Sequence, residues 1–221
     1  DTAKSQFGGA SLLLNVTGSD DEITVPDDSD WSFGGGDFTL EMWVRFASAG
    51  KGMFFQKNTA SQYSFQVYKA DSGGSGNDLW FQYTTDGSTE KGTSWAWNPA
   101  INTWFHVAVV RSGTTVTGYI DGSSIGTFTI GTDSVYDGTA IVRIGSSKDA
   151  GVGYYMNGWQ DEIRISNNAR YTANFTPSTS AFTNDNNTKL LIHCNGADAS
   201  TTFTDDNTAV AAASQWLLMG V

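Results

Sequence analysis

Short segments in which hydrophobic and polar residues alternate recur along the chain, separated by clusters of Gly, Asn, Asp and Ser. In residues 38–46, FTLEMWVRF, every second side chain is apolar, so we expect one strand face to pack and the other to be partly wet. Helical periodicity is almost absent, which predicts an all-β fold. The expected strands lie within residues 10–16, 22–26, 38–46, 52–57, 63–69, 78–85, 104–112, 115–121, 140–145, 161–166 and 189–194.

One hairpin is predicted from the turn residues alone. In VTGYIDGSSIGTFTI, Asp121 and Gly122 offer the positive φ angles that a tight turn needs between two strands. Many short strands at this spacing, joined by such turns, indicate two packed antiparallel sheets. We therefore predict an antiparallel β-sandwich.

Size and charge narrow the possible partners. A chain of 221 residues suits one sandwich domain, so we expect residues 1–221 to form a single unit. The net charge of −11, with only 12 scattered basic residues, argues against nucleic-acid binding, which needs clustered Lys and Arg. No apolar run is long enough to span a bilayer, so we expect no membrane insertion. The single cysteine, Cys194, excludes an internal disulfide.

Several segments, taken in order, carry a family resemblance. FGGASLLLNVTGSDDEITVPDDSDWSFGGGDFTLEMWVRF is followed by WFHVAVVRSGTTVTGYIDGSSIGT, VRIGSS and GWQDEIRISNNARYTANFTP. This series, over residues 7–177, resembles the laminin G-like domains of the concanavalin A-like lectin and glucanase superfamily. The resemblance implies a concanavalin A-like jelly roll, often a carbohydrate- or protein-binding module of secreted, cell-surface or phage virion proteins, and commonly a calcium ion.

The C-terminal segment adds a question about domain organisation. In similar proteins, segments such as NTKLLIHCNGADASTTFTDD often open a domain of this kind, yet here it begins at Asn187, after the domain. Residues 187–221 therefore resemble the opener of a following repeat, and the chain resembles a unit cut from a tandem array. Alternatively, the segment completes its own sandwich. We expect a fragment of a multidomain protein that uses both ends in one fold.

The spacing of the acidic residues does not support the pair of catalytic carboxyl groups that a glycosidase needs. A retaining glycosidase needs two carboxyl groups about 5 to 5.5 Å apart. Asp161 and Glu162 are adjacent, so in a regular strand they face opposite surfaces, and Glu162 with Arg164 is expected to be an outward charge pair. Glu41 has no second acid two or four positions away. We therefore expect no enzyme, although an unrecognised polysaccharide-active enzyme stays an alternative.

The histidines and the cysteine fit structural roles better than nucleophilic catalysis. His106 lies inside WFHVAVV and His193 inside LLIHC, and both segments have apolar strand patterns. Cys194 follows His193 directly, so the two side chains diverge in a strand, and no helix start lowers the thiol pKa. We expect both histidines to be satisfied sheet residues.

A structural calcium ion is a second candidate feature. Calcium prefers six to eight oxygen ligands, which Asp-rich loops such as GSDDEI and NGADAS can supply. In WQDEIRIS, alternation places Asp161 on the inward face with Ile163 and Ile165, where a carboxylate needs either a cation or several N–H donors. These two alternatives stay open. The candidate ligands are Asp20, Asp21, Asp161 and Asp198.

Carbohydrate binding uses aromatic faces for stacking and nearby polar groups for the hydroxyls. GTSWAWNPAINTW and GVGYYMNGW are the two candidate segments, although these aromatic residues could instead cover the sandwich. The candidate residues are Trp95, Trp97, Asn98, Tyr154, Tyr155 and Trp159.

These observations predict a non-catalytic module of an extracellular, cell-surface or virion protein. Its expected partner is a polysaccharide or other glycan, or a protein partner in a larger assembly. The main alternative is a structural or assembly domain, such as a virion decoration or tail-fibre repeat, that binds no glycan.

Overall fold

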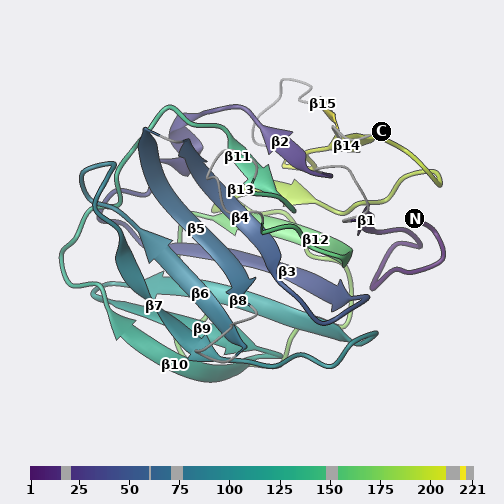
Figure 1. The fold of residues 1–221 in the computed structure, drawn as a ribbon, viewed down its shortest axis with the longest axis horizontal. Helices are drawn as coiled ribbons and strands as arrows, with labels where there is room; N and C mark the ends of the chain where they lie inside the picture. Colours follow the sequence, from purple (N-terminus) through teal and green to yellow (C-terminus); the bar gives the residue numbers. More distant parts are fainter. Residues whose placement is uncertain (16–20, 60, 71–76, 148–153, 208–214, 218–221) are drawn as a thin grey trace.

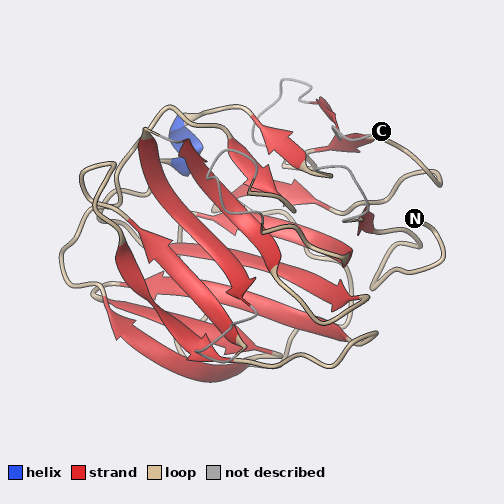
Figure 2. Ribbon diagram, viewed as in Figure 1, coloured by secondary structure: helices blue, strands red, loops and turns tan. Residues whose placement is uncertain are grey.

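The computed structural model describes residues 1–15, 21–59, 61–70, 77–147, 154–207 and 215–217. Two antiparallel sheets pack against each other, and Figure 1 shows β4, β5 and β6 in front of β3 and β8. In Figure 2 the regular structure of the described residues is strand, apart from one short helical turn, η1 (Ser29–Trp31). The prediction of an all-β antiparallel sandwich is therefore confirmed.

One sheet has seven strands in the order β1, β12, β3, β8, β9, β10, and β13 also pairs with β12. Its strands are β1 (Leu12–Leu14), β3 (Phe38–Phe46), β8 (Trp104–Ser112), β9 (Thr115–Ile120), β10 (Ser123–Thr129), β12 (Gly158–Ser166) and β13 (Thr188–Ile192). Because β13 pairs with β12, the C-terminal segment contributes a strand to this sandwich.

The other sheet has six strands in the order β2, β11, β4, β5, β6, β7. They are β2 (Ile23–Val25), β4 (Gly52–Thr59), β5 (Gln62–Ala70), β6 (Asp78–Tyr83), β7 (Lys91–Ala96) and β11 (Val142–Ile144). A small separate pair joins β14 (Thr202–Thr204) to β15 (Gln215–Leu217). The eleven expected segments all contain strands, and β7, β10, β14 and β15 were not among them.

The predicted hairpin joins β9 and β10. Asp121 and Gly122 have φ angles of 49° and 75°, and Ile120 is opposite Ser123. A Cβ atom on Gly122 would also lie 1.9 Å from the backbone oxygen of Phe175. Both the turn and the covering segment therefore require glycine at this position.

Most of the outer face of the seven-stranded sheet is buried at β3, although alternation predicted a partly wet face; of its four outward residues, Arg45 alone is partly exposed. Thr39 and Glu41 are fully buried, and Trp43 is 8% exposed. The chain after β12 covers them: Tyr171 and Phe175 pack with the outward side chains of β8 and β9. The local pattern does not reveal this cover, because it comes from residues far along the chain.

Strand β12 contains a β-bulge at the two adjacent acids. Asp161 lies opposite Trp43, whereas Arg164 lies opposite Glu41, so β12 has one more residue than β3 between these pairs. Glu162 has a positive φ of 51°. A bulge interrupts the alternation of side chains, and the prediction that the two acids face opposite surfaces was therefore wrong.

Both carboxylates are fully buried beneath segments that cover the outer face. Asp161 accepts a hydrogen bond from the backbone N–H of Phe7, whose ring packs edge-on against Trp43. Glu162 accepts one from the backbone N–H of Phe182. Glu162 is thus a buried anchor for the covering segment and not an exposed partner of Arg164.

Candidate functional site

Three glutamines lie side by side on the outer face of the six-stranded sheet, the face in front in Figure 1. Gln56 on β4 is opposite Gln66 on β5, which is opposite Gln82 on β6. Directly opposed residues of an antiparallel pair point to the same side. Their strand neighbours Val67 and Phe81 point the other way, into the core. A polar row therefore crosses this face.

An aromatic row lies beside the glutamines. Tyr68 and Trp80 are opposite each other and stack with ring centroids 6.0 Å apart and an interplanar angle of 7°. Tyr154, from the segment before β12, approaches Tyr68 at 4.7 Å between centroids, and the Lys51 ammonium lies 4.7 Å from the centre of the Tyr154 ring. Trp80 and Tyr154 are each partly exposed.

A hydrogen-bond chain fixes the orientation of these polar groups. The Gln66 amide donates to Oε1 of Gln82 at 2.6 Å, and the Tyr68 hydroxyl donates to the same oxygen at 3.0 Å. Nε2 of Gln82 then donates to the Glu90 carboxylate at 3.3 Å. Because these bonds hold the Gln66 and Gln82 amides in place, this part of the surface is preorganised.

A cavity of about 350 Å³ opens on this face next to the chain of hydrogen bonds. Asn58, Tyr63 and Gln66 line it, together with Glu90 and Tyr154. The combination of amide groups, a hydroxyl group and an aromatic ring in one hollow suits a ligand with both hydroxyl groups and apolar C–H surfaces.

Two buried amides at this site have unused hydrogen-bonding capacity. Both amide atoms of Gln56, and Oδ1 of Asn58, have no partner among the residues that the structure describes. The side chains are 0% and 2% exposed, respectively. An unsatisfied buried polar group costs about 1–3 kcal/mol, and native proteins retain few of them. A polar ligand in the cavity would satisfy the Asn58 oxygen, since Asn58 lines it, whereas Gln56 is not among the lining residues.

The tyrosine hydroxyls of the face stay protonated at neutral pH. Burial, and then the negative charge of Glu90, raises the pKa of Tyr63 well above its usual value. Burial, with the neighbouring Tyr154 and Glu90, raises the pKa of Tyr68 in the same direction. Both groups can therefore act as hydrogen-bond donors.

Trp95 and Trp97, predicted to bind a glycan, lie in the hydrophobic core with exposures of 6% and 8%. A Cβ atom on Gly118 would come within 2.7 Å of the Trp95 ring, so this ring sits directly on the backbone of β9. Trp97 packs between Phe46 and Phe105. Neither ring has a free face for stacking, which corrects this part of the prediction, because both rings fill the core between the sheets.

The other four predicted glycan-binding residues are spread over different parts of the molecule. Asn98 is exposed but adjoins the buried Trp97, and Tyr155 is partly buried. Trp159 donates from Nε1 to the Asp1 carboxylate at 2.8 Å. Of the six, only Tyr154 is among the residues that line the 350 Å³ cavity.

Asp161, the first metal candidate, has the surroundings of a hydrogen-bonded structural acid. Its carboxylate accepts bonds from the backbone N–H groups of Gln6, Phe7 and Glu162 at 2.8, 3.1 and 2.9 Å. Burial raises its pKa to about 7, although these donors act in the opposite direction. N–H groups that point at a carboxylate compete with a cation, so this geometry favours the second of the two alternatives.

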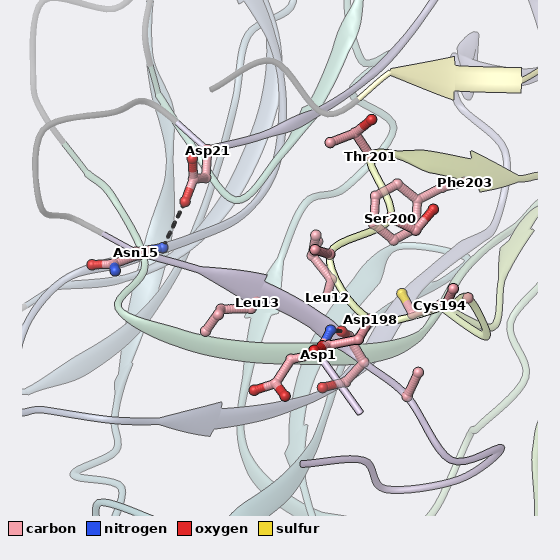
Figure 3. A pocket seen from close by; sticks show the side chains of 15 residues that line it. Asp1, Leu12, Leu13, Asn15, Asp21, Cys194, Asp198, Ser200, Thr201 and Phe203 are labelled. Atoms are coloured by element: carbon pink, nitrogen blue, oxygen red, sulfur yellow. Dashed lines mark hydrogen bonds between the residues drawn. The ribbon is translucent and has the colours of Figure 1, made fainter. Parts of the chain in front are cut away.

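Asp21 and Asp198 line a second cavity of about 610 Å³, between β1 and the segment after β13 (Figure 3). The Asp21 carboxylate accepts from the backbone N–H of Asn15, and Asp198 accepts from that of Thr2. Asp20 lies outside the described residues. Within the described part of the chain, no three His, Cys, Asp or Glu residues group closely enough to hold a metal ion. Calcium binding therefore stays a prediction.

Glu41 lies in a closed ionic cluster on the outer face of the seven-stranded sheet. It accepts from Nε of Arg164 at 2.7 Å and from the Tyr171 hydroxyl at 2.9 Å, and it shares a hydrogen bond with Nε2 of His106 at 3.1 Å. Burial would raise its pKa, but His106 and the charge of Arg164 lower it to about 2. With Glu41 and His106 both fully buried, this cluster supports the fold.

The second histidine also has a structural partner. Nδ1 of His193 lies 2.9 Å from both carboxylate oxygens of Glu162, and this hydrogen bond raises the histidine pKa. Burial raises the pKa of the Cys194 thiol well above its usual value, so the thiolate nucleophile is disfavoured. His193 is hydrogen-bonded to Glu162, so it is not placed as a general base for the Cys194 thiol.

Sequence reasoning missed Asn58 and Gln66, which line the cavity, and also Gln56 and Gln82, which lie in the same polar row as Gln66. The available signal was a glutamine in each of three successive strands, with apolar residues on both sides of it in FFQKN, SFQVY and WFQYT. An amide at the same alternating position in neighbouring strands predicts a polar stripe once the strands are paired in this order.

A family model described as the concanavalin A-like lectin/glucanases superfamily matches residues 17–174. The chain belongs to this superfamily. The match confirms the resemblance and the jelly-roll class that the sequence motifs predicted. A search of curated proteins found no match. No helix among the described residues is long and apolar enough to cross a membrane.

Three solved structures illustrate the fold. A Bacteroides ovatus protein described as a candidate carbohydrate-binding protein has a TM-score of 0.63 and 14% identity over 92% of this chain. The chain described here covers 60% of the length of that Bacteroides ovatus protein. A heptameric SAP-like pentraxin from Limulus polyphemus has a TM-score of 0.52 and 15% identity, with 95% and 94% of the two chains covered.

The third is the CBM40 domain of a Ruminococcus gnavus IT-sialidase, bound to α2,3-sialyllactose. Its TM-score is 0.54 and its identity 11%, with 76% of this chain and 95% of that domain covered. At these identities, the likeness of all three structures to this chain shows the fold alone.

Proposed function

We propose that this chain is a non-catalytic carbohydrate-binding module whose site is the outer face of β4, β5 and β6. The observation that carries the proposal is the buried Asn58 oxygen, without a partner among the described residues, in a cavity that also presents the Tyr154 ring. Amides bond sugar hydroxyls, and an aromatic ring stacks on sugar C–H groups.

The described residues of the cavity do not include the pair of carboxylic acids that a glycosidase uses. Glu90 is the one carboxylic acid among the described residues that line it, whereas hydrolysis with retention or inversion requires a pair. Asp161, Glu162 and Glu41 are fully buried on the other sheet and cannot reach a substrate here. These facts support binding without turnover.

The structural likenesses support the same class of ligand. The Ruminococcus gnavus domain is bound to a saccharide, and the Bacteroides ovatus protein is described in terms of carbohydrate binding. An extracellular, cell-surface or virion location stays a prediction from the resemblance, as does a role in a larger assembly.

Affinity gel electrophoresis against a panel of soluble polysaccharides tests the proposal. At least one polysaccharide should retard the protein, and Asn58→Ala and Tyr154→Ala should each weaken that binding by roughly tenfold, the equivalent of about 1.4 kcal/mol. Asn98→Ala, at an exposed position outside the cavity, is the matched control and should bind like the parent.

Melting temperatures separate lost binding from lost folding in these variants. The proposal fails if no polysaccharide retards the parent protein, or if the two site variants remain folded and bind as tightly as the control.

A further inference from the structure

We infer that this cavity selects neutral saccharides and rejects those that carry a carboxylate, such as sialylated or uronic acid glycans. The inference rests on the proposed function and adds the class of ligand. It is of interest because the same overall fold is found in a domain bound to sialyllactose.

The groups that line the cavity are almost entirely neutral. Asn58, Gln62 and Gln66 supply amides, Ser61 and Ser88 supply hydroxyl groups, and no lysine or arginine is among the described lining residues. Amides and hydroxyls exchange hydrogen bonds with sugar hydroxyls. A bound carboxylate instead requires a cation, most often Arg, to offset its desolvation.

Glu90 adds a negative charge at the edge of the cavity. Its carboxylate is held by the Gln82 amide, which is itself fixed by Gln66 and Tyr68. The Glu90 charge acts across the site, since it contributes to the raised pKa of both Tyr63 and Tyr68. A second acid, Asp86, adjoins the lining residues Gly87 and Ser88.

Three basic residues in the described strands of this sheet are committed to acids or to carbonyl groups. Arg143, opposite Gln56 in the sheet, pairs with Glu22. Lys57 is fully buried and pairs with both Asp27 and Asp137.

Two further lysines, Lys69 and Lys51, lie near the cavity face of the six-stranded sheet. Lys69 is buried and donates to the backbone oxygens of Gly50 and Ala70 and to Asn77. Lys51 lies over the Tyr154 ring. If an acidic ligand bound at this face, the positive charge of Lys51 would be the one to attract it. With an overall charge of −11, the field of the protein also repels anions.

Titration calorimetry with matched oligosaccharides tests the selectivity. The neutral set comprises hexamers of glucose, mannose and xylose, and the acidic set comprises sialyllactose and oligogalacturonate. We expect at least one neutral ligand to bind no less than tenfold more tightly than any acidic one. Removal of one like charge near the ligand is worth about 3- to 10-fold, so Glu90→Gln should strengthen the binding of acidic ligands by that factor relative to the binding of neutral ones.

Lys51→Met is the control for the cation that the described residues place at the aromatic row, and it should leave the preference for neutral ligands in place. Acidic ligands that bind as tightly as neutral ones would overturn the inference while supporting the proposed function. The same holds if Glu90→Gln leaves the preference unchanged. Binding of neither set would instead overturn the proposed function itself, and the inference with it.

Discussion

The Glu41→Gln variant would leave the buried charge of Arg164 without an anionic partner among the residues that the structure describes. The Glu41 side chain is fully buried, and that of Arg164 is 7% exposed. Loss of one member of a buried ion pair costs about 3–5 kcal/mol because the remaining charge stays desolvated. The substituted amide keeps the size of the side chain, so the loss would report on charge and hydrogen bonding and not on a cavity.

The lowered pKa of Glu41 gives a second value for the free energy that this ion pair contributes to folding. It falls from 4.5 to about 2 in the folded protein, and at 1.36 kcal/mol per unit this corresponds to about 3 kcal/mol. The folded pKa is the lower one, so this stability is fully present above pH 4.5 and is lost as the pH falls toward 2. The difference between parent and variant should therefore shrink over that acid range.

Urea unfolding followed by tryptophan fluorescence measures the effect. With a slope of about 2 kcal/mol per molar urea, a loss of about 3 kcal/mol lowers the midpoint by roughly 1.5 M at pH 7. The control is Glu90→Gln, an exposed acid with one side-chain bond, which should change stability by less than about 0.5 kcal/mol. Removing both charges, as Glu41→Gln with Arg164→Met, should recover part of the loss.

A loss below about 1 kcal/mol for Glu41→Gln, with no dependence on pH between 4.5 and 2, would refute the reasoning. It would mean that water reaches the cluster and screens its charges, contrary to the burial described above.

Three further measurements concern Trp97, Asp161 and the binding of calcium. Trp97→Ala should cost about 3–5 kcal/mol in urea unfolding, as for a core aromatic, while the fraction that remains folded should bind glycan like the parent; a loss of affinity alone would restore its predicted binding role. The pKa of Asp161 rises from 3.8 to about 7, so its contribution to stability is complete below pH 3.8 and is lost as the pH rises to 7. Asp161→Asn should therefore flatten the melting temperature over this range, and an unchanged pH profile would contradict the raised pKa. If calcium binds near Asp21 or Asp198, calcium should raise the melting temperature and EDTA should lower it, whereas equal values would remove the calcium prediction.

Much of the fold was predictable because it depends on local rules. The alternation in residues 38–46 placed the whole of β3, and the positive φ angles required at Asp121 and Gly122 placed the β9–β10 turn. Strand β7 was missed because KGTSWA lacks a run of β-branched residues, and its Trp95 was assigned to a ligand when it fills the space above Gly118.

The candidate site was far less predictable. Tyr154 was predicted because aromatic residues in a glycine-flanked loop are typical of binding surfaces. Its partners Tyr68 and Trp80 lie in strands to which the sequence assigned only a structural role. A single sequence carries no record of strand order, so the alignment of Gln56 with Gln66 across two strands could not be derived from it.

The sequence by itself determined the strand class, most strand positions, the tight turn and the acidic character, because side-chain periodicity, turn geometry and net charge are local or summed properties. Only the tertiary structure decided which faces are covered and which residues meet. The bulge that turns Asp161 and Glu162 to one side, and the cover over Glu41, depend on contacts between segments more than 100 residues apart. The polar cavity has the same origin, since Asn58, Glu90 and Tyr154 become neighbours only when the sheet is assembled.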